Sequence, residues 1–143
     1  MSLPKPEAGL VVRYDFLWAR DADKGKTSSK VRPACLAFTP DDVTNPNFVA
    51  LLPITHSPPA SSTVGIEIPR AVCEHLGLDD GRSWIILSEF NIDDWPNAGL
   101  QPVPGKRGKF TYGFIPPILF ETIRKRFLEL VEKGQSRGTR RSP

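Results

Sequence analysis

The chain has 143 residues, of which 39% are hydrophobic and 24% charged, as in an ordinary soluble globular domain. Its net charge of +3 and pI near 9.0 favour a polyanionic partner without requiring one. No apolar run reaches the roughly eighteen residues of a membrane span, and the N-terminus lacks the apolar core of a secretory signal. We therefore expect a cytoplasmic protein with no membrane partner.

Residues 10–18 are rich in β-forming residues, and from Val12 the even positions are apolar while Arg13 and Asp15 point the other way, which predicts a half-buried strand. Residues 19–30 are charged and offer nothing to pack, which predicts a mobile, solvent-facing loop. Two interpretations of this loop stay open: a plain connection between strands, or a lid over a nearby site. A lid is considered because compact domains keep few unstructured loops of this length without a role.

Two apolar runs follow, at 33–38 and 48–54, and each predicts a strand. Pro33 has no N–H, so it must open its strand or lie on an edge. Residues 48–54 are apolar on both sides, which indicates a central strand. Alternation at 64–68 predicts a further strand, and Pro69 then opens a short helix that ends at Gly77.

The second half of the chain mixes loops with two more apolar elements. A strand at 84–87 leads into a polar segment at 88–96 and a Pro/Gly/Lys-rich loop at 97–109, and 110–114 predicts a last short strand. Pro116 and Pro117 open a helix that Gly134 ends. Its predicted apolar face consists of Leu119, Ile123, Phe127, Leu130 and Val131. Residues 1–133 are predicted to form one domain, and the basic segment 134–143 to be disordered.

Five or six short strands with one inserted and one terminal helix predict a mainly β (β-rich α+β) fold, either a small barrel or a strongly curved sheet. The fifteen prolines agree with many fixed turns. Cys35 and Cys73 lie in apolar surroundings without close spacing, so we expect two buried free thiols.

Polar groups mark one end of each of the first two apolar runs. Arg32 comes before the first run, and Thr55 and His56 follow the second. If these strands are antiparallel, the three side chains meet at one edge of the sheet. A guanidinium matches the geometry of a phosphate, a hydroxyl can bind a phosphate oxygen, and an imidazole can act as general acid or base. The alternatives are a surface ion pair for Arg32, a turn cap for Thr55 and no role for His56.

These elements resemble those of the MazF/PemK/Kid family in kind and order: a strand led by Gly9, then Lys30-Val-Arg-Pro-Ala, then Leu52-Pro-Ile-Thr. The family comprises metal-independent endoribonuclease toxins of toxin–antitoxin pairs. The resemblance runs from about Gly9 to the last helix and implies an SH3-like barrel, no cofactor, and catalytic roles for Arg32 and Thr55. It also implies cleavage of single-stranded RNA to a 2′,3′-cyclic phosphate, a homodimer that binds RNA along its interface, and an antitoxin protein that blocks the groove.

Further site residues are candidates on looser grounds. Glu89 is a candidate catalytic residue that holds Arg32 or receives a proton, in a segment that departs from the family pattern. Trp18 is expected in the core, with stacking on the bases of a single strand as its alternative role. The candidate substrate-binding residues at the rim, each with a solvated or structural alternative, are Asp15, Lys30, Arg82, Ser88, Asn91 and Trp95.

The sequence lacks a zinc-type Cys/His spacing, a Gly-rich phosphate loop and a Gly-x-Ser-x-Gly elbow, which argues against a metal site and against metallohydrolase, NTPase and esterase functions. Two alternatives to a nuclease remain. One is a non-catalytic SH3-like module that binds nucleic acid or protein. The other is a partner-dependent regulatory protein that keeps the toxin scaffold.

Overall fold

The computed structural model describes residues 4–27, 29–39, 47–78, 81–95 and 99–141, which contain eight strands and three helices. In chain order these are β1 (Leu10–Phe16), α1 (Ala19–Ala22), β2 (Lys30–Phe38), β3 (Phe48–Thr55), β4 (Gly65–Glu67), α2 (Arg70–Leu76), β5 (Trp84–Ile86), β6 (Glu89–Asp94), β7 (Thr111–Phe114), α3 (Pro117–Glu132) and β8 (Arg137–Arg140).

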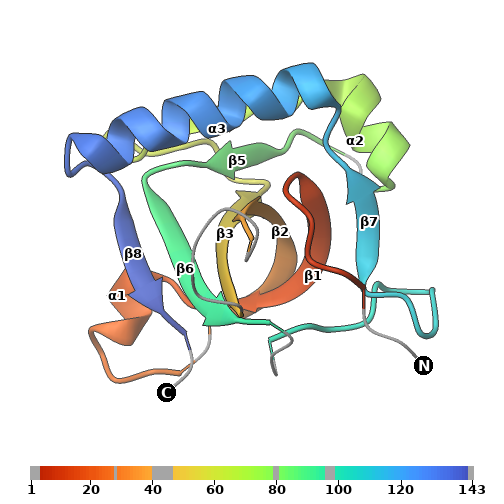
Figure 1. Cartoon of the computed structure of the whole chain (residues 1–143), viewed down its shortest axis with the longest axis horizontal. Coiled ribbons are helices and arrows are strands. Elements are labelled where there is room, and N and C mark those ends of the chain that lie inside the picture. The colour runs from red at the N-terminus through yellow and green to blue at the C-terminus, as the bar shows by residue number, and fades with distance from the viewer. Residues whose placement is uncertain (1–3, 28, 40–46, 79–80, 96–98, 142–143) are drawn as a thin grey trace.

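The sheet is organised around β3. One edge of β3 pairs with β2, while the other pairs first with β6 and then with β5, all antiparallel. The strand order is β4-β5-β3-β2-β1-β7, and β8 adds in parallel beside β6. Figure 1 shows that the sheet is strongly curled, with β1, β2 and β3 at its middle and α3 running across one side. The predicted mainly β small barrel with an inserted helix (α2) and a C-terminal helix (α3) is confirmed, as is the central place of β3.

Apolar side chains fall into two clusters because successive residues of a strand point to opposite faces. One cluster, called here the inner cluster, includes Val12, Tyr14, Phe16, Leu36 and Leu51. The outer cluster lies between the sheet and helices α2 and α3, and it includes Cys35, Leu52, Cys73, Leu76, Ile85, Ile123, Phe127 and Leu130. Burial of both faces explains the unbroken apolar run of β2. Each fully buried large apolar side chain contributes about 1.5–3 kcal/mol.

Helix α3 follows its predicted pattern except at one position. Ile123, Phe127 and Leu130 are buried, but Val131 is 40% exposed, so the predicted apolar face was too wide at its C-terminal end. Cys35 and Cys73 are buried free thiols as expected, and burial raises the pKa of Cys35 to about 12. In the described part of the chain, no helix has the length and apolar character needed to cross a bilayer.

The segment 19–30 is not the unstructured loop that its charge pattern predicted. It contains α1, and the side chain of Ser29 donates to Asp21 and accepts from the backbone N–H of Trp18 at 3.0 Å. Ala19 is buried, so the segment does contribute to packing. Residue 28 lies outside the described residues. Asp21 and Ser29 hold this short local structure together through these bonds, which composition alone does not reveal.

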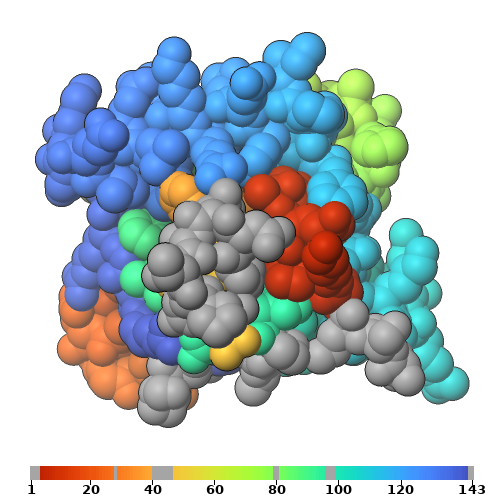
Figure 2. Space-filling model, in the orientation of Figure 1, coloured from red at the N-terminus to blue at the C-terminus, as the bar shows by residue number. Residues whose placement is uncertain are grey.

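The C-terminal segment is also ordered where disorder was predicted. β8 pairs with β6, and three arginines in or directly after β8 contact aspartates elsewhere in the chain. Arg137 contacts Asp23 at 2.7 Å, Arg140 contacts Asp94 at 2.6 Å, and Arg141, just after the strand, contacts Asp15 at 3.0 Å. Figure 2 shows the orange segment that holds α1 lying against the blue of β8. Residues 142 and 143 lie outside the described part.

Candidate functional site

A hollow of about 650 Å³ opens where β2 and β3 separate. Their ladder ends at the pair Ala34 and Pro53, after which β3 pairs with β5 while β2 stays paired with β1 alone. The two prolines explain this end point, because neither Pro33 nor Pro53 has an N–H to donate. The prediction that Pro33 lies on a strand edge is therefore confirmed on the β3 side.

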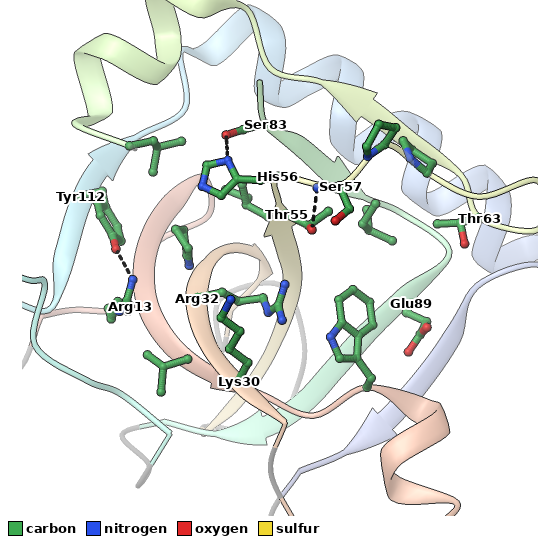
Figure 3. Close-up of a pocket in the computed structure, with 18 of the residues that line it drawn as sticks. Arg13, Lys30, Arg32, Thr55, His56, Ser57, Thr63, Ser83, Glu89 and Tyr112 are labelled. Atoms are coloured by element: carbon green, nitrogen blue, oxygen red, sulfur yellow. Dashed lines mark hydrogen bonds between the residues drawn. The ribbon is translucent and has the colours of Figure 1, made fainter. Parts of the chain in front are cut away.

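Arg32 and Thr55 line this hollow together. Counting two residues outward from Ala34 and Pro53 along each strand brings Arg32 opposite Thr55. By alternation, Arg32 shares its face with Ala34 and Thr55 shares its face with Leu51, and both of those residues belong to the inner cluster. The two side chains therefore project on the same side of the sheet into a common accessible space, as Figure 3 shows.

Arg32 is half-buried and makes no hydrogen bond or ion pair with any described residue. Its Nε atom is buried without a partner, and its Cζ lies 5.1 Å from the centre of the Trp18 ring. Burial, with the nearby charge of Arg20, lowers its pKa from the ordinary arginine value. A guanidinium remains protonated under such a shift. A buried donor without an acceptor is costly, so this side chain is prepared to bind an anion.

Thr55 ends β3, and its Oγ1 accepts a hydrogen bond from the backbone N–H of Ser57 at 3.2 Å. The turn-cap interpretation is thus correct as far as it goes. This role leaves the Thr55 hydroxyl able to donate its own proton to a group bound in the hollow.

His56 also lines the hollow, and its ring is exposed. Nδ1 lies 3.1 Å from the carbonyl oxygen of Arg82 and 3.4 Å from the hydroxyl of Ser83. A carbonyl only accepts, so the bond to Arg82 requires the proton on Nδ1 and makes Nε2 the acceptor nitrogen of the neutral ring. An imidazole fixed in this way can exchange a proton with a group bound in the hollow.

Glu89 lines the hollow but does not hold Arg32, contrary to one of its predicted roles. Its Oε1 accepts a hydrogen bond from the backbone N–H of Ala19 at 2.8 Å. In the view of Figure 3, Arg32 lies between Glu89 on one side and the Arg13–Tyr112 pair on the other. The Glu89 carboxylate therefore anchors the start of α1.

Of the predicted substrate-binding residues, Lys30 lines the hollow and the other five do not. Asp15 pairs with Arg141, and Arg82 pairs with Glu67. The remaining three are held by backbone groups: the Ser88 hydroxyl by Val64 N–H at 3.0 Å, the Asn91 amide by both backbone groups of Leu17 at 2.7 and 2.8 Å, and the Trp95 indole by the Pro4 carbonyl at 3.0 Å. These contacts give the five side chains structural roles outside the hollow.

Three charged or aromatic residues that line the hollow were not predicted there: Arg13, Arg20 and Tyr112. Arg13 was recognisable as pointing away from the apolar positions of its strand, but its partner Tyr112, at 3.2 Å, lies 99 positions away. Trp18 does pack on the inner cluster as predicted, and its ring also faces Arg20 and Arg32. No local signal in the sequence gives these contacts.

Among the described residues, no group of three or more His, Cys, Asp and Glu side chains could hold a metal ion. The hollow instead gathers the cations Arg13, Arg20, Lys30 and Arg32, and Glu89 is the one carboxylate among its described lining residues. Comparison with protein-family models finds no match, and comparison with curated protein sequences finds no significant match. The hollow can bind an anion through its cations and can exchange a proton through His56.

Proposed function

We propose that this protein is a metal-independent endoribonuclease that cleaves single-stranded RNA by attack of a 2′-hydroxyl on the adjacent phosphodiester. One observation carries the proposal: Arg32 and Thr55 line the same cationic hollow from facing positions on β2 and β3. Such an arrangement suits a single phosphate, since a guanidinium can bind two of its oxygens while a hydroxyl donates a hydrogen bond to a phosphate oxygen.

The proposed reaction assigns one task to each group. The 2′-oxygen forms a bond to phosphorus while the bond from phosphorus to the 5′-oxygen breaks, which leaves a 2′,3′-cyclic phosphate and a free 5′-hydroxyl. Arg32 stabilises the charge that develops on the phosphoryl oxygens, and Thr55 orients the phosphate. His56 takes the proton of the 2′-hydroxyl or gives one to the leaving 5′-oxygen, and solvent water makes the other proton transfer. No metal ion is needed in this scheme.

The biological role we propose follows the resemblance to the MazF/PemK/Kid toxins. The protein would act in the cytoplasm as a homodimer with RNA along its interface, and an antitoxin protein would neutralise it by covering the groove. The elements that carry the resemblance, Arg32-Pro33 and Pro53-Ile54-Thr55, are the ones that end the β2–β3 ladder and open the hollow. Growth arrest on expression, relieved by the product of a neighbouring gene, would support this role.

The test is incubation with a long unstructured RNA in excess chelator, followed by mapping of the new ends. We expect discrete cuts with cyclic phosphate ends, lost in Arg32→Ala and in Thr55→Ala. The matched controls are Arg70→Ala and Thr122→Ala, which change exposed residues of α2 and α3 outside the hollow. Cuts that persist in both hollow variants, or that disappear when chelator is added, would refute the proposal.

A second candidate function is a non-catalytic module that binds nucleic acid. The observation that favours it is the engagement of the Glu89 carboxylate by the Ala19 amide, which gives this carboxylate a structural role and leaves the scheme with His56 alone for proton transfer. Binding of single-stranded RNA without any cut, unaffected by Thr55→Ala, would favour this module over the enzyme.

A further inference from the structure

The hollow has a second group of hydrogen-bond donors, Arg13 and Tyr112, on the wall away from Glu89. Arg13 of β1 donates from Nη1 to the hydroxyl oxygen of Tyr112 on β7 at 3.2 Å, and both side chains line the hollow. Because the oxygen of Tyr112 accepts this bond, its own proton is available to donate elsewhere. The remaining N–H groups of Arg13 are available as well, so the pair offers several donors to one ligand.

The arginines of the hollow differ in their surroundings from five arginines outside it. Outside it, Arg70, Arg82, Arg137, Arg140 and Arg141 each contact a carboxylate at 3.3 Å or less. Within the described residues, neither Arg13 nor Arg32 has a carboxylate partner. Like charges gathered in a partly buried space repel one another, and their assembly is favourable when a polyanion supplies the missing counter-charge.

Arg13 and Arg32 occupy different positions along the strands and point to opposite faces. Arg13 pairs with Pro33 across the β1–β2 ladder, one residue away from the pair that contains Arg32. Adjacent residues of a strand point to opposite faces, so Arg13 and Arg32 approach the hollow from the two sides of the unpaired edge of β2. Figure 3 shows the Arg13–Tyr112 pair set apart from the Arg32 head group. One phosphate held between Arg32 and Thr55 therefore leaves the Arg13–Tyr112 pair for another.

We infer that Arg13 and Tyr112 form a second phosphate-binding position, so that the ligand of the hollow is a chain of at least two consecutive phosphodiesters. This inference rests on the proposed function for the phosphate at Arg32 and Thr55, and it adds the residues that bind the neighbouring phosphate of the same RNA strand. Arg13 binds the neighbouring phosphate and takes no part in bond cleavage.

The test uses 2′-O-methyl oligouridylates, which lack the attacking hydroxyl and are not cleaved. Binding to the full chain is measured by NMR titration for a dinucleotide with one phosphate, a trinucleotide with two, and a trinucleotide whose second linkage is a neutral methylphosphonate. We expect the second charged phosphate to tighten binding about tenfold and the neutral linkage to give no such gain.

Variants then show which residues cause the tighter binding of the second phosphate. Arg13→Gln should abolish it and lower the slope of log affinity against log salt by about 0.7. Tyr112→Phe should reduce it several-fold, and it serves as a second test should Arg13→Gln unfold. The control Arg70→Gln should keep the full gain. The inference is overturned when wild type binds none of the oligonucleotides, shows no gain, or keeps its gain in Arg13→Gln and Tyr112→Phe.

Failure of this inference is distinguishable from failure of the proposed function. Cleavage of 2′-hydroxyl RNA without any gain from the second phosphate would leave the nuclease standing and remove the second phosphate position. A gain in affinity from the second phosphate without any cleavage would support the second phosphate position and remove the nuclease function.

Discussion

The Glu89 carboxylate accepts a hydrogen bond from the Ala19 amide at 2.8 Å, across 70 positions of the chain. This bond ties β6 to the start of α1, directly after Trp18, whose ring centre lies 5.1 Å from the Arg32 Cζ. Glu89 therefore positions one wall of the hollow without pairing with the guanidinium.

Replacing Glu89 separates this positioning role from proton transfer. Glu89→Gln keeps an oxygen acceptor for the Ala19 amide, so we expect stability and RNA cleavage to stay close to wild type. Glu89→Ala leaves that amide without its partner and should lower the free energy of unfolding by about 1 kcal/mol. Urea denaturation and a cleavage assay on both variants measure the two effects. Loss of cleavage in Glu89→Gln with normal stability would instead assign Glu89 a proton-transfer role.

His56 is expected to act in the chemical step more than in binding. His56→Gln should lower kcat about 100-fold, within the usual range for loss of a general acid or base. The affinity for an uncleavable 2′-O-methyl oligonucleotide should change little. His75→Gln, on the exposed side of α2, is the matched control. Equal kcat in wild type and His56→Gln would remove His56 from the mechanism.

The hydroxyl of Tyr14 donates to the buried carboxylate of Asp93 at 2.6 Å. Burial, reinforced by the charge of Asp93, raises the pKa of Tyr14 far above its ordinary value, so the hydroxyl remains a donor. Tyr14→Phe removes this donor from a buried charge and should lower the free energy of unfolding by about 1.5–3 kcal/mol. Urea denaturation measures the loss, and oligonucleotide affinity should be unchanged. A loss below about 0.5 kcal/mol would show that the bond contributes little in solution.

The contact of β8 with the segment after α1 should respond to acid. Two hydrogen bonds from Arg137 lower the pKa of Asp23 below its ordinary 3.8. The folded carboxylate is harder to protonate than the unfolded one, so this contribution is present above the ordinary pKa and is lost as pH falls through the lowered one. Unfolding in urea between about pH 5 and pH 2 should show a smaller acid-induced loss for Arg137→Gln than for wild type. Identical pH profiles would contradict the assignment.

The parts of the fold that sequence predicted are those with local patterns. The Arg32-Pro33 and Pro53-Ile54-Thr55 elements combine an apolar run, a residue without an N–H and a polar end within a few positions. An antiparallel pairing then suffices to bring Arg32 and Thr55 together. For this reason the centre of the candidate site was predictable without any long-range information.

The parts that were missed depend on distant partners. β6 carries Asn91 and Asp93 at its buried positions, where an isolated strand pattern would require apolar residues. They are tolerated because Leu17 and Tyr14, 74 and 79 positions away, satisfy their hydrogen bonds. β8 is polar throughout and is held by aspartates of other elements. Burial of a polar side chain with its partner leaves no periodic signal in the sequence.

The central claim is that Arg32 and Thr55 act on the same phosphodiester, and a double-mutant cycle on kcat/KM tests it most directly. Groups that contact one phosphate act as a unit, so their effects on the transition state are coupled. We expect the double variant Arg32→Ala with Thr55→Ala to cleave RNA little more slowly than the slower single variant. Losses that multiply independently, giving a double variant slower by the product of the two single effects, would contradict the claim.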